Sequence, residues 1–267
     1  MRKISANYIF PVSSAPLKNG IIVLDDANAI IDVIDTGGKI KEIENLQFYS
    51  GMIVPGFVDV FTLLSYPSFT KENFQEITLG DFFNNLKNKL TEFPKNADSF
   101  QRGINHLEAF GTVAAADFFP LEDNENRKKK SKVKFIDHDF SECALELPLK
   151  INSDSKSILL NQFVLELGKS FTPTENEYNR YCVGTGSLAT HQKLSIFEEI
   201  KAIQELFPEL SYFDLLSWAT INGAKHLQLD DKIGSIEIGK TPGLNLLTKL
   251  DYTNKKLTKE SELKVLL

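Results

Sequence analysis

The strongest constraint on the fold of this 267-residue chain is the contrast between its two ends and its middle. Every second residue from Ile4 to Phe10 is apolar, as in a strand with one buried face. Residues 19–35 (NGIIVLDDANAIIDVID) place two apolar runs around a turn-forming segment, which predicts a β-hairpin. Residues 234–250 (GSIEIGKTPGLNLLTKL) also have alternating apolar positions, and Gly and Pro mark the turns between the runs. Both ends are therefore predicted to be β-structure.

The middle of the chain mixes helical spacing with short apolar runs. Apolar residues recur at helical intervals in 80–93 and 98–110, which predicts two helices. Residues 51–60 and 112–119 (TVAAADFF) are apolar enough to be buried strands. The charged stretch 122–132 (EDNENRKKKSK) mixes both signs, so we interpret it as a solvated surface loop.

The next hundred residues contain further strand and helix signals. Strands are predicted at 132–137, 143–149 and 180–186, whereas 157–167 fits a strand or a helix. Two helices have start signals in which a serine is followed three residues later by an acidic residue. Ser195 with Glu198 makes a capping box, and Ser211 with Asp214 makes a looser one.

Composition excludes several classes of protein. A hydrophobic content of 42% and a charged content of 25% are typical of a globular chain that folds without disulfides or a structural metal. A net charge of −6 argues against a general nucleic-acid binder. No apolar run approaches the roughly 18 residues of a membrane span, and the amino end has no apolar signal-peptide core. Two cysteines make no disulfide framework, so we expect a cytoplasmic protein.

Three stretches of the sequence together resemble a known family. They are NGIIVLDDANAIIDV with GMIVPGFVDV (51–60), VGTGSLATHQKLSIFEEIKAI (183–203) and LSYFDLLSWATINGAKHLQLDDKIGSIEIGK (210–240). These stretches resemble the amidohydrolase superfamily, in its cytosine deaminase and S-adenosylhomocysteine deaminase-like branch. The resemblance covers both ends of the chain well and the middle poorly.

The resemblance implies a fold and a division into domains. Such proteins combine a metal-bearing (β/α)8 barrel with a small β-sandwich that both chain ends build. We therefore expect an α/β protein with a composite β-sandwich domain formed by 1–53 and 231–267, and a barrel domain at 54–230. The family's zinc or iron is held by an H-x-H pair on strand 1, by histidines on strands 5 and 6, and by an aspartate after strand 8 that also moves protons. The metal supplies hydroxide by lowering the pKa of a bound water.

The chain departs from this pattern at three ligand positions. Phe61 and Leu63 stand where the H-x-H pair is expected, and Gly186 stands at the aspartate of G-T-D-S-L-A. None of these side chains can ligate a metal. The stretch 157–167, where the strand-5 ligand is expected, contains no histidine. We predict that no metal cofactor is bound and that apolar side chains fill the former centre.

The remaining polar candidates are weaker. One local cluster has ligand-type chemistry, namely Asp137, His138 and Asp139, but a polar turn is the commoner origin of such a tripeptide. In a strand the two aspartates would face one side and the histidine the other. His106, His191 and His226 do not align with ligand positions, and the spacing of Cys182 and His191 does not establish a nucleophile–base pair.

The barrel is also too short for its family. A complete barrel takes about 250 residues, whereas 54–230 has 177. Between Thr112 and Gly186 there are 75 residues, enough for two or three units of roughly 30 residues each. The link from 137 to 143 is too short for a parallel crossover, which favours a hairpin there. We expect an incomplete barrel.

Three functions remain open. The first is a non-catalytic relative, a pseudoenzyme that binds a partner or small ligand. The second is a divergent hydrolase that acts on C–N bonds through a relocated or borrowed site. The third is a subunit that completes or regulates a full-length homologue. An opened barrel exposes strand edges, which favours a homodimer or a complex with such a homologue. We expect neither nucleic acid nor a membrane as a partner.

Overall fold

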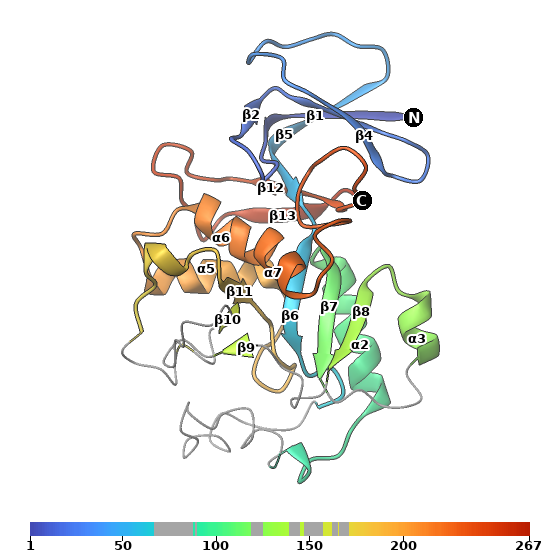
Figure 1. Cartoon of the computed structure of the whole chain (residues 1–267), viewed down its shortest axis with the longest axis vertical. Helices are drawn as coiled ribbons and strands as arrows, with labels where there is room; N and C mark the ends of the chain where they lie inside the picture. Colours follow the sequence, from blue (N-terminus) through green and yellow to red (C-terminus); the bar gives the residue numbers. More distant parts are fainter. Residues whose placement is uncertain are drawn as a thin grey trace.

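We describe the protein from a computed structural model (Figure 1). The structure describes residues 1–66, 88, 90–118, 125–138, 145–146, 157–161, 165 and 171–267. The predicted helix at 80–93 lies mostly outside these residues, as does Asp139. No helix among the described residues is long and apolar enough to cross a membrane.

Strands from both chain ends form one seven-stranded sheet. The order is β13-β12-β5-β1-β3-β4, with β2 beside β1. The β1–β5 pair is parallel, and the other pairs are antiparallel. The strands are β1 (Arg2–Ile9), β2 (Leu17–Lys18), β3 (Ile21–Leu24), β4 (Ile30–Ile34), β5 (Leu46–Pro55), β12 (Leu244–Thr248) and β13 (Glu262–Val265). The predicted hairpin is β3–β4, and the predicted union of the two chain ends occurs through β12 and β5.

The apolar face of this sheet explains why the two ends need each other. Ile22, Ile53, Ile236, Leu244 and Leu246 belong to one buried cluster. A hairpin alone is marginal in water, and the added strands supply the apolar surface that it lacks. The strands make one sheet, so a sandwich of two layers is not confirmed. The segment GSIEIGK is not a strand; it is held by single contacts such as Ile236 N–H to the Pro11 carbonyl at 3.0 Å.

Gly56 connects this sheet to the central one. The predicted strand at 51–60 is two strands, because β5 ends at Pro55 and β6 (Phe57–Thr62) begins after the glycine. A Cβ atom at Gly56 would lie 2.7 Å from the Pro242 carbonyl oxygen and closer still to the Val113 side chain. Only glycine therefore lets the chain pass between the sheets at this point.

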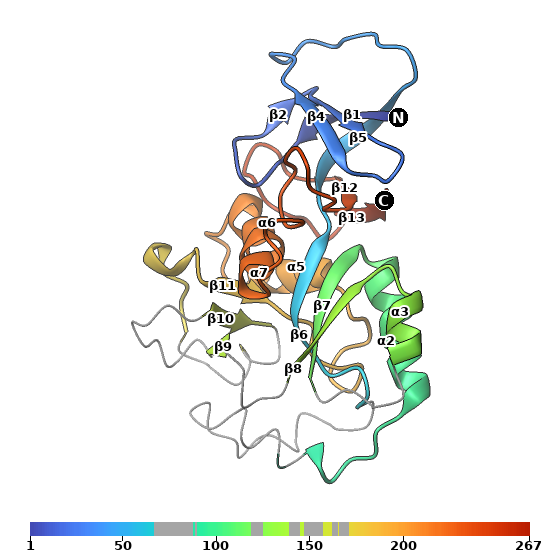
Figure 2. The ribbon, with the colours of Figure 1, turned by 45° about the vertical axis from the view of Figure 1, so that its right-hand side comes forward.

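Among the described residues, two three-stranded parallel sheets make up the central part, and their arrangement can be followed in Figures 1 and 2. One sheet has the order β6-β7-β8, with β7 (Thr112–Phe118) and β8 (Lys134–His138). The other has the order β11-β10-β9, with β11 (Tyr181–Val183), β10 (Ser157–Leu160) and β9 (Leu145–Glu146). A parallel bridge between Thr62 and Gly186 joins the two sheets.

The described strands do not close into a barrel. Within the ranges given above, β8 pairs with β7 and β9 pairs with β10, and no pairing joins β8 to β9. The predicted hairpin between 132–137 and 143–149 is therefore wrong. Its two strands join different sheets, and each is parallel to its partner there.

The helices confirm most of the helical predictions. They are α2 (Ala97–Ala109), α3 (Glu125–Lys130), α5 (Ile196–Leu206), α6 (Tyr212–Ala219) and α7 (Ile221–His226), with a 3₁₀ turn at η5 (Glu175–Glu177). The Ser211–Asp214 pair makes a complete capping box before α6. The Ser195 side chain caps α5 by accepting from the Glu198 N–H. The sequence had suggested the reverse ranking of the two pairs.

The stretch 122–132 is not a plain loop. Its described part forms the helix α3, in which no residue is buried when backbone and side chain are counted together. The Lys128 side chain nevertheless points inward and is only 11% exposed. The mixed charges predicted a solvated segment. This lysine instead pairs with a buried carboxylate on a neighbouring strand, as described below.

Candidate functional site

The carboxyl ends of the parallel strands are where ligands bind in α/β folds, because loops converge there. In this chain that end carries Thr62 on β6, Asp117 on β7 and His138 on β8. Asn161 and Gly186 follow β10 and β11. Phe61 and Leu63 flank Thr62, so the three positions that the family pattern assigns to metal ligands all lie at this end.

Phe61 and Leu63 are buried at this end. Each side chain is 2% exposed, and both belong to an apolar cluster with Tyr66, Phe118 and Leu159. The ring centroids of Phe61 and Phe118 are 5.2 Å apart. Burial of such a side chain contributes on the order of 1.5–3 kcal/mol to folding. The space around the two residues is therefore packed with hydrocarbon.

Gly186 makes a backbone connection between the two central sheets. Its N–H donates to the Phe61 carbonyl at 2.8 Å, and its carbonyl accepts from the Leu63 N–H at 2.7 Å. These two bonds form the bridge between the sheets. Its φ angle is +69°, a region where a residue with a Cβ atom is strained. A Cβ atom there would meet nothing closer than Asn161 Nδ2, at 3.7 Å.

The described residues at this end do not fit the divalent metal of the family. Phe61, Leu63 and Gly186 offer no donor atom, and such a site takes three or more N, O or S ligands. Within the part of the chain that the structure describes, no three His, Cys, Asp or Glu side chains gather as a metal-binding group.

Asp59 is a buried carboxyl group that joins β6 to the end of β11. Its Oδ1 accepts from the N–H groups of Phe61 and Thr185, both at 3.1 Å. Its Oδ2 is 2.5 Å from the Thr185 hydroxyl. The side chain is fully buried, and desolvation raises its pKa from 3.8 to about 7, against the opposing effect of these hydrogen bonds. The group can therefore exchange a proton near neutral pH.

Asp117 is a second buried carboxyl group, at the end of β7. Its Oδ2 lies 3.1 Å from Lys128 Nζ, and the same ammonium group contacts Asp137 on β8. Burial raises the pKa of Asp117 to about 6, and the Lys128 charge opposes that shift. Lys128 also lies over the rings of Phe100 and Phe135. The trio ties α3 to the ends of two strands.

This trio includes one member of the predicted cluster of Asp137, His138 and Asp139, which stays a prediction. Asp137 forms an ion pair with Lys128. The backbone of His138 is in β8 opposite Phe118, and its side chain is outside the described atoms, as is all of Asp139. Lys128 lies in a run of four basic residues, and nothing in the sequence distinguishes it as the one whose side chain points inward.

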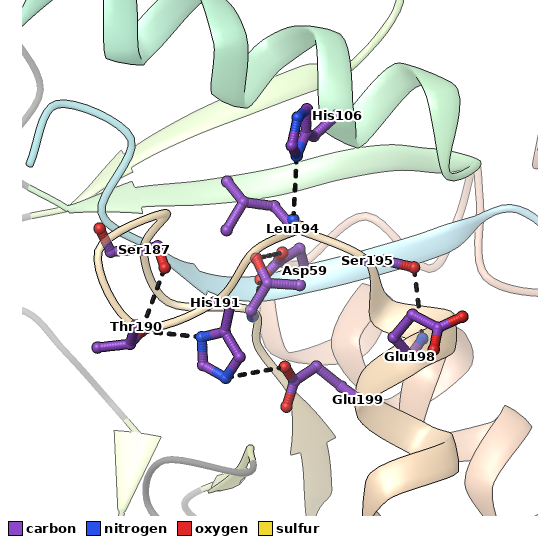
Figure 3. Close-up of polar contacts among 10 residues, drawn as sticks. Asp59, His106, Ser187, Thr190, His191, Leu194, Ser195, Glu198 and Glu199 are labelled. Carbon is purple, nitrogen blue, oxygen red and sulfur yellow. Dashed lines mark hydrogen bonds and ion pairs between the residues drawn. The ribbon is translucent and has the colours of Figure 1, made fainter. Parts of the chain in front are cut away.

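The loop after β11 brings a histidine and a carboxylate together (Figure 3). His191 Nε2 lies 3.2 Å from Glu199 Oε1, and both side chains are buried. Thr190 Oγ1 lies 2.8 Å from His191 Nδ1 and 3.1 Å from the Ser187 carbonyl. The single hydroxyl proton can go to only one of these two acceptors. If it goes to Ser187, Nδ1–H donates to Thr190, and a hydrogen bond between Nε2 and Glu199 then needs a second proton, on either group.

The other polar candidates are not brought into this group. His106 Nδ1 accepts from the Leu194 N–H at 3.3 Å, and burial lowers the pKa of this imidazole, with Arg102 and Lys193 adding to the effect. Cys182 is fully buried, and desolvation raises the pKa of its thiol to about 12, which makes it a poor nucleophile.

Sequence reasoning missed the polar contacts that matter most here. Asp59 and Thr185 are 126 residues apart, and Lys128 and Asp117 lie on different elements. The only sequence signal was the apolar setting of each aspartate, in VPGFVDV and TVAAADFF. An acidic residue inside such a run marks a buried carboxyl group that requires partners.

Comparison with known proteins gives both a sequence match and a fold match. A model of the amidohydrolase family matches residues 180–264. The 5-methylthioadenosine/S-adenosylhomocysteine deaminase of Thermoanaerobacter pseudethanolicus is 32% identical over 112 residues, which is 33% of this chain and 26% of that protein. The enzyme of the same description from Caldanaerobacter subterraneus is 32% identical over 93 residues, covering 31% and 22%. The matches thus span about a quarter of these relatives.

The structural likeness extends further than the sequence match. The aminofutalosine deaminase of Helicobacter pylori, solved with methylthio-coformycin, superposes with a TM-score of 0.57 over 96% of this chain and 94% of that one. The sequence identity is 14%, so this likeness concerns the fold alone. The chain therefore has an α/β fold with mixed sheets that is similar to the fold of this deaminase.

Proposed function

Since this chain belongs to the amidohydrolase superfamily, in its cytosine deaminase and S-adenosylhomocysteine deaminase-like branch, we propose that it is a non-catalytic member that acts by binding. In this proposal it has an incomplete barrel at 54–230 and a composite domain formed by 1–53 and 231–267. Phe61, Leu63 and Gly186 are the vestigial positions of the family's metal centre.

The observation that carries the proposal is the apolar packing around Phe61 and Leu63. Both side chains are 2% exposed and lie in the cluster that contains Tyr66 and Phe118. A hydroxide-generating metal needs an open coordination position and donor atoms in that space. Replacing one ligand would leave a variant site, whereas these three replacements remove most of a coordination sphere.

A binding role is supported by the open arrangement of the strands. In the described part of the chain β8 pairs only with β7, so its other edge offers N–H and C=O groups for a further strand. A second copy of this chain, or a full-length homologue, could supply that strand. The proposal therefore includes a homodimer or such a complex as the working form.

Metal content and turnover test the proposal together. The protein is expressed in medium supplemented with zinc and iron, and its metal is measured by inductively coupled plasma mass spectrometry. Turnover is assayed with 5′-methylthioadenosine and S-adenosylhomocysteine, with the Thermoanaerobacter enzyme as the positive control. We expect far less than one metal ion per chain and no ammonia release. One bound metal with deamination would overturn the proposal.

The second candidate is a hydrolase with a relocated site, which the Thr190, His191 and Glu199 contacts favour. A hydroxyl, an imidazole and a carboxylate in sequence have the order of a nucleophile, its base and the group that orients the base. If hydrolysis is detected without metal, His191→Gln should abolish it, and the control His106→Gln should not. Equal activity in both variants would exclude this site.

A further inference from the structure

A cavity of about 400 Å³ lies at the end of the central strands opposite to the site described above. It is bounded by the first residues of β7, by Lys134 at the start of β8 and by Val265 on β13. These lining residues lie where the central strands meet the sheet built by the chain ends; the arrangement of β7, β8 and β13 can be followed in Figure 2. Its volume falls within the roughly 300–1,000 Å³ typical of small-molecule sites.

The walls of the cavity are largely hydrocarbon. Val113 faces it from β7, and Leu229 and Ile233 face it from the segment after α7. Leu229 and Ile233 are 6% and 8% exposed, so these buried side chains form the floor of the cavity. Thr112 also lines the cavity, and its buried Oγ1 has no hydrogen-bond partner among the described residues. A polar group or water at the deep end would satisfy that hydroxyl.

The rim of the cavity is cationic. Lys132, Lys134 and Lys232 line it, and Lys132 and Lys134 have no carboxylate partner among the described residues. Lys232 has only a 4.0 Å contact with the exposed Asp231. Glu108, the acidic side chain of the lining, already accepts from the Ser131 hydroxyl at 2.6 Å and the Lys132 N–H at 3.0 Å.

We infer that this cavity binds a small organic anion that has an apolar, ring-sized body and one carboxylate. The body fits the Val113, Leu229 and Ile233 floor, and the carboxylate meets the lysine ammonium groups at the rim. An isolated inorganic anion would gain nothing from the floor, and an organic cation would be repelled by the rim. The inference goes beyond the proposed function, because the cavity uses no residue of the former metal centre.

Isothermal titration calorimetry on the full chain tests the inference with 2-naphthoate, acetate and 2-naphthylmethylamine as probes. We expect saturable binding of 2-naphthoate alone. The Lys132→Gln/Lys134→Gln variant should weaken it about tenfold or more, the loss expected for charge-assisted contacts. The control Lys39→Gln/Lys41→Gln removes two exposed lysines elsewhere and should leave the affinity within about twofold.

Amide chemical-shift mapping with 2-naphthoate locates the site even if a variant folds poorly. Shifts should gather at Val113 and Ile233, far from Phe61 and Leu63. Equal binding of the amine and the carboxylate, an unchanged affinity in the Lys132/Lys134 variant, or shifts centred at the other strand ends would each overturn the inference. None of these outcomes bears on metal content or deamination, so the two proposals fail separately.

Discussion

The buried carboxyl group of Asp59 makes the stability of this protein depend on pH in an unusual direction. Its pKa is raised from 3.8 to about 7 in the folded state, so between these values the folded chain binds more protons than the unfolded chain. The free energy of unfolding therefore falls as pH rises through this window. One such group contributes a slope of about −1.4 kcal/mol per pH unit, which amounts to about 4 kcal/mol over the whole window.

The variant Asp59→Asn isolates this contribution. An amide mimics the protonated carboxyl group, because its oxygen can still accept from the N–H groups of Phe61 and Thr185 and its NH2 can donate to the Thr185 hydroxyl. The variant should lose about 1.4 kcal/mol per pH unit of the downward slope between pH 5 and 6.5. Asp117, whose raised pKa adds a similar slope, is present in both proteins and cancels in the comparison.

Urea unfolding at half-unit pH steps measures the slopes. Trp218, the single tryptophan, is fully buried and reports the transition. Glu125→Gln is the control, because Lys129 lowers the pKa of this exposed carboxylate from its ordinary value of 4.5, which is already below the measured interval of pH 5 to 6.5. If the wild type and Asp59→Asn have parallel profiles, the carboxyl group is ionised throughout, and the argument from desolvation is wrong.

Three further predictions test the packing and the domain plan. Phe61→Ala should lower the free energy of unfolding by about 3–5 kcal/mol through a cavity in the apolar cluster, and a loss below about 1 kcal/mol in urea titration would mean that the ring is not packed. Phe61→His with Leu63→His and Gly186→Asp should not restore metal-dependent deamination, since further family ligands are lacking; measurable turnover with added zinc would show a surviving second ligand set. Deleting 232–267 should reduce amide protection in 20–35 by hydrogen exchange, and unchanged protection would refute the dependence of the hairpin on β12.

Much of the local structure could be predicted from the sequence. The alternation at 4–10 and the turn within 19–35 predicted β1 and the β3–β4 hairpin, and the Ser211–Asp214 pair predicted the start of α6. These features depend on periodicity and capping within a few residues, so no tertiary partner is needed to specify them. That Phe61 and Leu63 carry no metal-ligating group was likewise visible in the sequence alone.

Only the tertiary structure decided which distant groups meet. The Asp59–Thr185 contact, the choice of Lys128 as the partner of Asp117, and the His191–Glu199 pair each depend on how strands and loops converge. The same holds for the strands at 134–138 and 145–146, which join separate parallel sheets although their short link favoured a hairpin. Sequence spacing constrains the local structure of residues that are close in the chain. Pairing between distant segments is set by the burial of whole apolar faces and by the need to satisfy each buried polar group.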